Sequence, residues 1–150
     1  MNNVIPVINS HNSWSQLEEV WLGDVYPASW YDHLEPSVRQ VFQELTAITQ
    51  EDLASIQTTL ESLGVTVRRP SYKNIEDYLF NGTLVKPQIC PRDQFVTVGN
   101  SLRYHPDHTL PWQEVLNEYA QDARCSLIVN YDICINGANV VRVGRDIIID

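Results

Sequence analysis

Apolar residues in the first part of the chain mark a strand, a loop and then a helix. Residues 18–25 (EEVWLGDV) hold a β-branched and aromatic cluster closed by Gly23, which predicts a strand. Residues 26–37 (YPASWYDHLEPS) are rich in proline and aromatic side chains and predict a loop. From Pro36 onward, apolar residues recur at spacings of three and four, as on one face of a helix: Val38, Val41, Phe42, Leu45 and Ile48.

The same apolar face continues further along the chain. Thr49 followed by Asp52 is a possible capping pair, so we expect a second helix to begin here and to carry Leu53, Ile56, Leu60 and Leu63. Gly64 predicts the end of that helix. Residues 65–70 (VTVRRP) alternate in character and predict a strand that Pro70 ends.

The second half of the chain predicts shorter elements. Residues 71–93 lack a clean period and read mostly as loop, whereas residues 94–100 (QFVTVGN) and 101–105 (SLRYH) predict a hairpin that turns at Gly99-Asn100. Pro111 opens a helix whose apolar positions are Trp112, Val115, Leu116 and Tyr119. Three further strands are predicted, at residues 125–130, 138–143 and 146–150, the last two joined by a turn at Gly144-Arg145. A plan of hairpin or strand, helix and further strand thus occurs about twice.

Composition narrows the class of protein. The chain has 150 residues, 43% hydrophobic and 19% charged, which suits one globular domain with a real core. Its net charge of −9 repels phosphate backbones and argues against nucleic-acid binding, while it suits a cationic ligand or simply keeps the protein soluble. No apolar run approaches 18 residues and no basic, apolar leader precedes the first strand. We therefore expect a soluble cytoplasmic protein without a membrane partner.

Most chemistry-bearing residues form no recognisable motif. Cys90, Cys125 and Cys134 have no CxxC spacing, which argues against a disulfide framework or a structural zinc site. The segment HPDH from His105 to His108 brings three metal-capable side chains together around Asp107. A solvated turn before the next helix is the favoured reading, because proline after His105 disfavours both imidazoles pointing one way. His11 and His33 are isolated, and the glycines match no phosphate-binding pattern.

Residues 90–95 (CPRDQF) are the most promising candidate site. Arg92 and Asp93 lie where a loop enters a strand, and Pro91 fixes the approach. A carboxylate at that place can hold a guanidinium through two parallel hydrogen bonds. A local Arg92–Asp93 ion pair, or an Asp93 side chain bound to nearby backbone amides, remains as an alternative.

Four segments, in this order, carry a family resemblance: residues 12–25 (NSWSQLEEVWLGDV), 51–70 (EDLASIQTTLESLGVTVRRP), 91–100 (PRDQFVTVGN) and 136–149 (NGANVVRVGRDIII). Together they resemble the amidinotransferases, the group that includes glycine amidinotransferase and inosamine-phosphate amidinotransferase. The resemblance implies an α/β (α+β) fold of the pentein type, a ring of five β/α modules that surrounds a central active site. Residues 1–150 would form the N-terminal portion of one such domain, with roughly the first two to three modules of an incomplete propeller.

The resemblance also implies a chemistry. Such enzymes transfer an amidino group from arginine to an amine through a covalent amidino-cysteine, with a histidine as general acid and base and no metal or organic cofactor. Asp93 matches the family's substrate-contacting aspartate. Asn136 stands where the family has its catalytic aspartate, in a pattern reading Phe-Asp-Ala-Ala-Asn or Phe-Asp-Ala-Ala-Asp. Here that pattern is Ile135-Asn136-Gly137-Ala138-Asn139. The family's histidine and cysteine would lie beyond Asp150, so this portion is expected to be inactive alone.

Three hypotheses about function remain. The first is an amidinotransferase-like enzyme that acts only with a C-terminal half supplying the cysteine and the histidine. The second is a non-catalytic remnant that binds arginine, another guanidino compound or a protein. The third is a guanidino-group hydrolase of the arginine deiminase type. The apolar residues 146–150 (DIIID) are expected to present an open strand edge, so association with a missing half or with a second copy is predicted.

Overall fold

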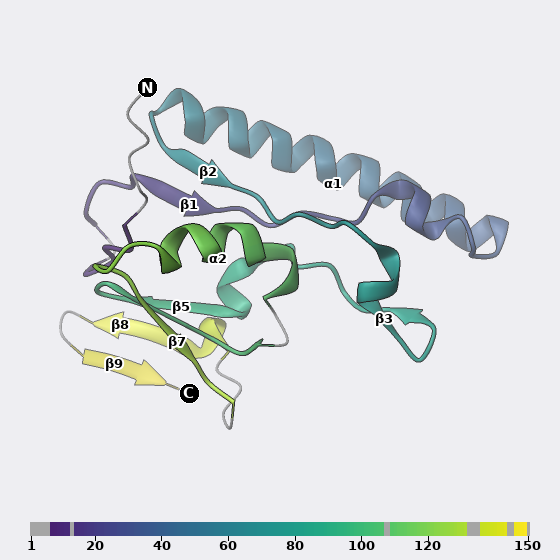
Figure 1. The fold of residues 1–150 in the computed structure, drawn as a ribbon. Helices are drawn as coiled ribbons and strands as arrows, with labels where there is room; N and C mark the ends of the chain where they lie inside the picture. Colours follow the sequence, from purple (N-terminus) through teal and green to yellow (C-terminus); the bar gives the residue numbers. More distant parts are fainter. Residues whose placement is uncertain (1–6, 13, 107–108, 132–135, 144–145, 150) are drawn as a thin grey trace. The chain divides into compact units, whose positions relative to one another are not determined.

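The computed structural model of the chain describes residues 7–12, 14–106, 109–131, 136–143 and 146–149. These residues form a mixed α/β structure with four small sheets (Figure 1). The chain divides into two compact units, one of Leu17–Ile89 and one of Met1–Gln16 together with Cys90–Asp150. The predicted pentein ring and its number of modules stay predictions, as does the single domain over residues 1–150.

The unit of residues 17–89 is built on a strand–helix–strand plan. Strands β1 (Glu19–Trp21) and β2 (Thr66–Arg68) pair in parallel, with Glu19 opposite Thr66, and helix α1 (Pro36–Ser62) connects them. Figure 1 shows α1 lying along this two-stranded sheet. A parallel pair needs such a crossover, and the strand–helix–strand reading of this region is confirmed.

Helix α1 is one continuous helix of 27 residues, so the expected break near Thr49 is wrong. The Thr49 hydroxyl donates a hydrogen bond to the Leu45 carbonyl, as it does in a helix interior, and does not cap a new helix. Between Ser37 and Ser62 there is no glycine or proline to interrupt the backbone ladder. The predicted end is confirmed: Gly64 has φ +82°, in the left-handed region that ends many helices.

The apolar residues in the first half of α1 are largely exposed. Val41, Leu45 and Ile48 are each more than half exposed, whereas Thr46 and Leu53 are buried. The buried side of the helix is therefore rotated away from the apolar residues of its first half, whereas Leu53 of the predicted face is buried as expected. That side contacts β2 and the 3-10 helix Ala28–Tyr31.

An aromatic cluster forms the core beside α1. Tyr26, Tyr31 and Tyr78 are buried, and Trp30 and Tyr72 pack against them. The ring centroid of Tyr26 lies 5.0 Å from that of Trp30 and 4.8 Å from that of Tyr72, and the Trp30 and Tyr72 centroids are 6.2 Å apart. The predicted loop of residues 26–37 thus contains the 3-10 helix Ala28–Tyr31 and supplies much of this core. Beside the cluster, the Tyr72 hydroxyl accepts a hydrogen bond from Gln88 N (2.8 Å) and donates to Asp24 O (3.3 Å).

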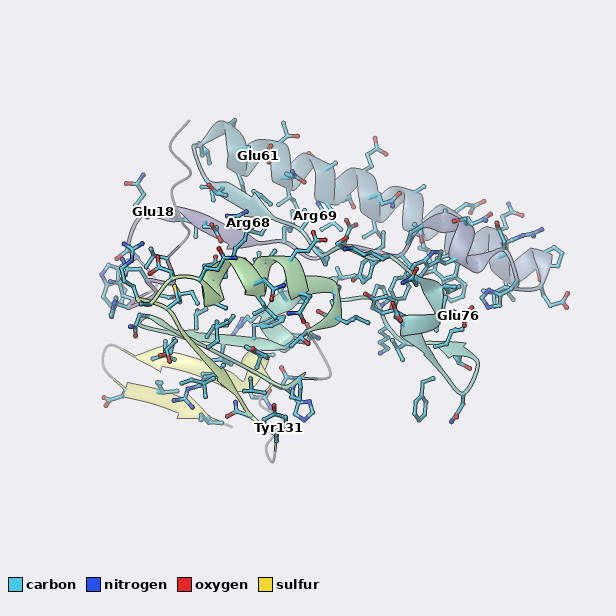
Figure 2. The ribbon with its side chains drawn as sticks, viewed as in Figure 1. Glu18, Glu61, Arg68, Arg69, Glu76 and Tyr131 are labelled. Atoms are coloured by element: carbon cyan, nitrogen blue, oxygen red, sulfur yellow. The ribbon has the colours of Figure 1, made fainter. Side chains whose placement is uncertain are left out.

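Two ion pairs link the end of β2 and the residue after it to β1 and the segment that follows β1. Arg68 lies 3.4 Å from Glu19 across the parallel pair, and Arg69 lies 2.8 Å from Asp24. Figure 2 labels both arginines, which project from neighbouring positions at the end of β2. Both arginines of the strand predicted for residues 65–70 are therefore paired with carboxylates.

Residues 71–93 contain more structure than the predicted loop. The 3-10 helix Ile75–Tyr78 is followed by a short hairpin of β3 (Leu79–Phe80) and β4 (Thr83–Leu84). Asn81 and Gly82 join these strands with φ of +51° and +73°, the geometry of a tight hairpin turn. The Asn-Gly pair was the available signal, and the shortness of the two strands hid it.

The other unit contains a three-stranded sheet with the order β5-β6-β7. Strands β5 (Phe95–Val98) and β6 (Ser101–Tyr104) form the predicted antiparallel hairpin, and β7 (Ser126–Val129) pairs in parallel with β6. Helix α2 (Gln113–Ala120), which follows the 3-10 helix Leu110–Trp112, makes the crossover. The core of this unit contains Phe95, Leu102, Trp112 and Leu116, of which Trp112 is fully buried.

A second hairpin repeats the first. Strands β8 (Val140–Val143) and β9 (Asp146–Ile149) are antiparallel and, like β5 and β6, have four residues each with two residues between them. Each hairpin follows a three-residue 3-10 helix, Pro91–Asp93 (η3) or Gly137–Asn139 (η6). The predicted turn Gly144-Arg145 and residue Asp150 lie outside the described residues. Strand β9 pairs along one edge with β8, while Ile147, Ile148 and Ile149 are exposed.

No helix in the described part of the chain is long and apolar enough to cross a membrane.

Candidate functional site

The Pro-Arg-Asp segment forms the compact turn η3 at the entrance to β5. Its backbone is held by hydrogen bonds from Asp93 N to Cys90 O (3.1 Å) and from Gln94 N to Pro91 O (3.0 Å). Asp93 is half-buried and Arg92 is exposed. Among the described residues, no hydrogen bond or ion pair engages the Asp93 carboxylate. The alternative of a local Arg92–Asp93 ion pair is therefore not what this structure adopts, and the carboxylate stays available for a cation.

Asn136 begins the second turn, η6, and its side chain has a structural role. Its Oδ1 accepts a hydrogen bond from Ala138 N at 2.9 Å, while Asn139 N donates to the Asn136 carbonyl at 3.0 Å. The amide therefore caps the turn in the way that asparagine and aspartate cap helices. Aspartate would make the same bond and add a negative charge.

This cap leads to a graded stability prediction. We expect Asn136→Ala to lower the free energy of unfolding by about 1 kcal/mol, because Ala138 N loses its partner, and Asn136→Asp to stay within a few tenths of the original value. Urea unfolding followed by circular dichroism measures both. An alanine variant as stable as the original protein would show that the cap contributes nothing.

Gly137 brings the two candidate turns together. It is buried, and a methyl group placed on it would overlap the carbonyl oxygen of Arg92 and lie 2.8 Å from that of Phe95. The turns η3 and η6 are in direct contact. Asp93 and Asn136, 43 positions apart in sequence, thus stand on adjoining turns. No pattern in the sequence singled out Gly137 as a contact residue, although a glycine where the resembled pattern has alanine was a usable signal.

A pocket of about 380 Å³ opens beside the contact between the turns. Its walls are mostly aliphatic or backbone, with Arg92 as the charged member: Arg92, Phe95, Val96, Thr97, Gly137, Val140 and Val141. Neither Asp93 nor Asn136 belongs to this lining. The cavity therefore lies beside the predicted site residues, and a ligand of Asp93 would approach from elsewhere on the turn.

The remaining candidate residues contribute no metal site. Within the described ranges, no group of three or more histidine, cysteine, aspartate or glutamate side chains could hold a metal ion. His105 is half-buried, and Asp107 and His108 lie outside the described residues, as does Cys134. Cys90 is exposed, and the half-buried Cys125 accepts a hydrogen bond from Ile8 N at 3.3 Å.

Comparison with known proteins identifies the fold. No protein-family model matches the chain, and no curated protein matches its sequence. Among solved structures, inosamine-phosphate amidinotransferase StrB1 from Streptomyces griseus matches with a TM-score of 0.69 and 21% identity, over 93% of this chain and 54% of that one. SxtG, an amidinotransferase from Microseira wollei in the saxitoxin biosynthetic pathway, matches with a TM-score of 0.66 and 23% identity, over 93% and 53%.

The chain therefore has an amidinotransferase-like fold, and the predicted resemblance is confirmed at the level of fold. It spans about half the length of the solved structures that it matches.

Proposed function

We propose that this chain is the substrate-binding portion of an amidinotransferase-like protein and that it holds a guanidino compound such as arginine at Asp93. The reacting cysteine and histidine would be supplied by polypeptide corresponding to the other half of the matched structures. The acceptor of the amidino group would be an amine. The reaction, its substrates and the assembly are all part of this proposal.

The observation that carries the proposal is the contact between η3 and η6. Two turns that the resemblance singled out independently adjoin one another through Gly137, and they lie within a fold shared with two amidinotransferases. Asp93 stands at the end of its turn with a carboxylate that no described residue engages. A guanidinium offers paired N–H donors to such a carboxylate, and a charge-assisted bond of this kind is stronger than a neutral one.

Catalysis would then need groups beyond Asp93. A thiolate attacks the guanidinium carbon, the amine leaves with a proton, and the amidino group stays on sulfur until a second amine attacks. A negative charge near the histidine would stabilise its protonated form during these steps. Asn136 lacks that charge, so its position supports structure and weakens the case for full activity.

The missing negative charge at Asn136 favours a second candidate function, a non-catalytic guanidino-binding protein. The Asn136 Oδ1 caps its turn, a structural role that does not need the negative charge of a catalytic aspartate. The two candidates differ in one assay. Co-production of the chain with the half of StrB1 that it does not cover, followed by an assay for amidino transfer from arginine, supports the enzyme if product forms and the binding protein if it does not.

Arginine binding itself is the direct test of the Asp93 role. We expect titration calorimetry to detect L-arginine binding and Asp93→Asn to weaken it by about tenfold or more, because the charge-assisted bond contributes about 1.5–3 kcal/mol. Asp146→Asn removes an equal charge from an exposed position and serves as the matched control. If both variants weaken binding equally, general acidity and not Asp93 attracts the ligand. If the original chain releases no heat with arginine, the proposal fails.

A further inference from the structure

Two amide side chains in the unit of residues 90–150 each keep a polar atom that is buried and unpaired. They are Oε1 of Gln94 and Nδ2 of Asn130, neither of which has a hydrogen-bond partner within the described part of the chain. Buried polar atoms in native proteins are nearly always paired, so each exception needs an explanation. Gln94 offers an acceptor and Asn130 offers a donor.

The sheet places both amides at one end. Phe95 of β5 pairs with Tyr104 of β6, which pairs with Val129 of β7. Gln94 directly precedes Phe95, and Asn130 directly follows Val129, where Asn130 N donates to Tyr104 O at 2.9 Å. The two amides therefore flank the same end of a three-stranded sheet, about 10 Å apart because neighbouring strands lie about 4.8 Å from each other.

Asp93 lies at this same end. It directly precedes Gln94 in the chain, and its carboxylate is unengaged by described residues. On the opposite flank, Tyr131 follows Asn130 and is 74% exposed, projecting from the segment after β7 (Figure 2). The sheet end thus combines a carboxylate, an unpaired acceptor and an unpaired donor, and it borders on solvent.

Gln94 Oε1 and Asn130 Nδ2 are shielded from solvent, but rotation of each side-chain amide would expose them to a ligand. Gln94 and Asn130 are only half-buried as residues. The terminal torsions of glutamine and asparagine are broad, so rotation of each amide costs little. A ligand that accepts from one amide and donates to the other would pair both atoms at once, which neither residue achieves within the described structure.

We propose that Gln94 and Asn130 determine specificity at the Asp93 site by binding the two ends of an arginine-like amino acid. Gln94 Oε1 accepts an N–H of the guanidinium that Asp93 holds. Asn130 Nδ2 donates to the α-carboxylate. An extended arginine side chain is long enough to bridge the two flanks of the sheet end. This inference rests on the proposed function, because Asp93 fixes where the cation lies.

Two ligands separate the roles of the amides. L-Arginine carries both end groups, whereas agmatine has the guanidinium and lacks the carboxylate. We expect Gln94→Met to weaken both ligands about tenfold or more, and Asn130→Leu to weaken arginine about tenfold while agmatine stays within about twofold. Gln121→Met, at an exposed position after α2, is the matched control and leaves both affinities unchanged.

Thermal unfolding supplies a readout that does not depend on ligand. Because each apolar replacement removes an unpaired buried atom, Gln94→Met and Asn130→Leu are expected to raise Tm by about 2–6 °C. Residues that serve structure alone would lower Tm when replaced. The opposite signs of the stability and affinity changes are therefore specific to amides kept for a ligand.

A third variant tests Asn130 with a substitution that keeps the shape of the side chain. Asn130→Asp keeps the shape and places a carboxylate against the carboxylate of arginine, so preference shifts from arginine towards agmatine by about tenfold. Unchanged affinities in all three variants, together with a lower Tm, would mean that the amides bind only internal water or other parts of the protein. That result would overturn the inference and leave the Asp93 proposal standing. Absence of arginine binding in the original chain would overturn both.

Discussion

Replacement of Gly137 by alanine is expected to lower the free energy of unfolding by about 3 kcal/mol or more. The added methyl would overlap the Arg92 carbonyl oxygen, and Phe95 O and Arg92 C would lie at 2.8 and 3.1 Å. All three are backbone atoms, so no side chain can rotate out of the way. Relief requires the turns η3 and η6 to move apart, which separates Asp93 from Asn136. Arginine binding should weaken together with stability.

Gly64 supplies the control for this substitution. Its φ is +82° and no atom lies within 4 Å of an added Cβ, so Gly64→Ala tests backbone strain without crowding. That strain costs about 1–2 kcal/mol. In thermal scans we expect the Gly137 variant to melt at a lower temperature than the Gly64 variant, although Gly137 itself has no positive φ. The reverse order would mean that the two turns are not in tight contact.

Exposure to alkali is expected to unfold the unit of residues 17–89 through its tyrosine cluster. Burial raises the pKa of Tyr78 to about 12, with a further increase from the charge of Asp77. Burial also raises the pKa of Tyr26, which adjoins Tyr78 and Tyr31, and that of Tyr72, where the hydrogen bond from Gln88 N opposes the rise. In the unfolded chain these phenols would ionise near pH 10.

The sign of the pH dependence follows from these shifts. Because the folded pKa values exceed the unfolded ones, the stabilisation is fully present below about pH 10 and is lost as pH rises towards the folded values. With three phenols shifted upward, the free energy of unfolding falls by up to about 4 kcal/mol per pH unit in that window. A domain of ordinary stability, about 5–15 kcal/mol, would lose most of it by about pH 12.

Near-ultraviolet absorbance of tyrosinate and circular dichroism measure this transition together. We expect ionisation and unfolding to coincide. Tyr26→Phe should raise the midpoint pH, because no described residue hydrogen-bonds the Tyr26 hydroxyl and the replacement removes an ionisable group. Tyr72→Phe should lower stability already at neutral pH, since it deletes the bonds to Gln88 N and Asp24 O. Gradual ionisation near pH 10 without unfolding would contradict the prediction.

Local patterns predicted the elements well where a short stretch decides the outcome. The hairpin at Gly99-Asn100 and the end of α1 at Gly64 depend on turn residues, and both are confirmed. The break near Thr49 was wrong because a capping pair competes with an uninterrupted helix, and the helix keeps more backbone hydrogen bonds. The apolar residues in the first half of α1 are exposed because the buried side of a helix depends on the elements that pack against it, which periodicity alone does not reveal.

The candidate site shows the same division. Pro91 and Asp93 could be singled out because their turn is local in sequence. The role of Gly137 could not, since its crowding arises from backbone atoms 42–45 positions earlier. Likewise, the unpaired atoms of Gln94 and Asn130 depend on strand register and burial, which a composition or a motif does not contain. The cap made by Asn136 lies between these cases, because asparagine before a turn is a local signal.

The two similar hairpins differ in how they begin. Asn139, the last residue of η6, is directly followed by β8, whereas Gln94 stands between η3 and β5. The first hairpin thus has one residue more before it than the second, and a shift of one residue reverses the face on which every following side chain lies. Gln94 is the residue that makes this difference. The buried, unpaired Oε1 of Gln94 therefore stands at a position that the second hairpin does not have.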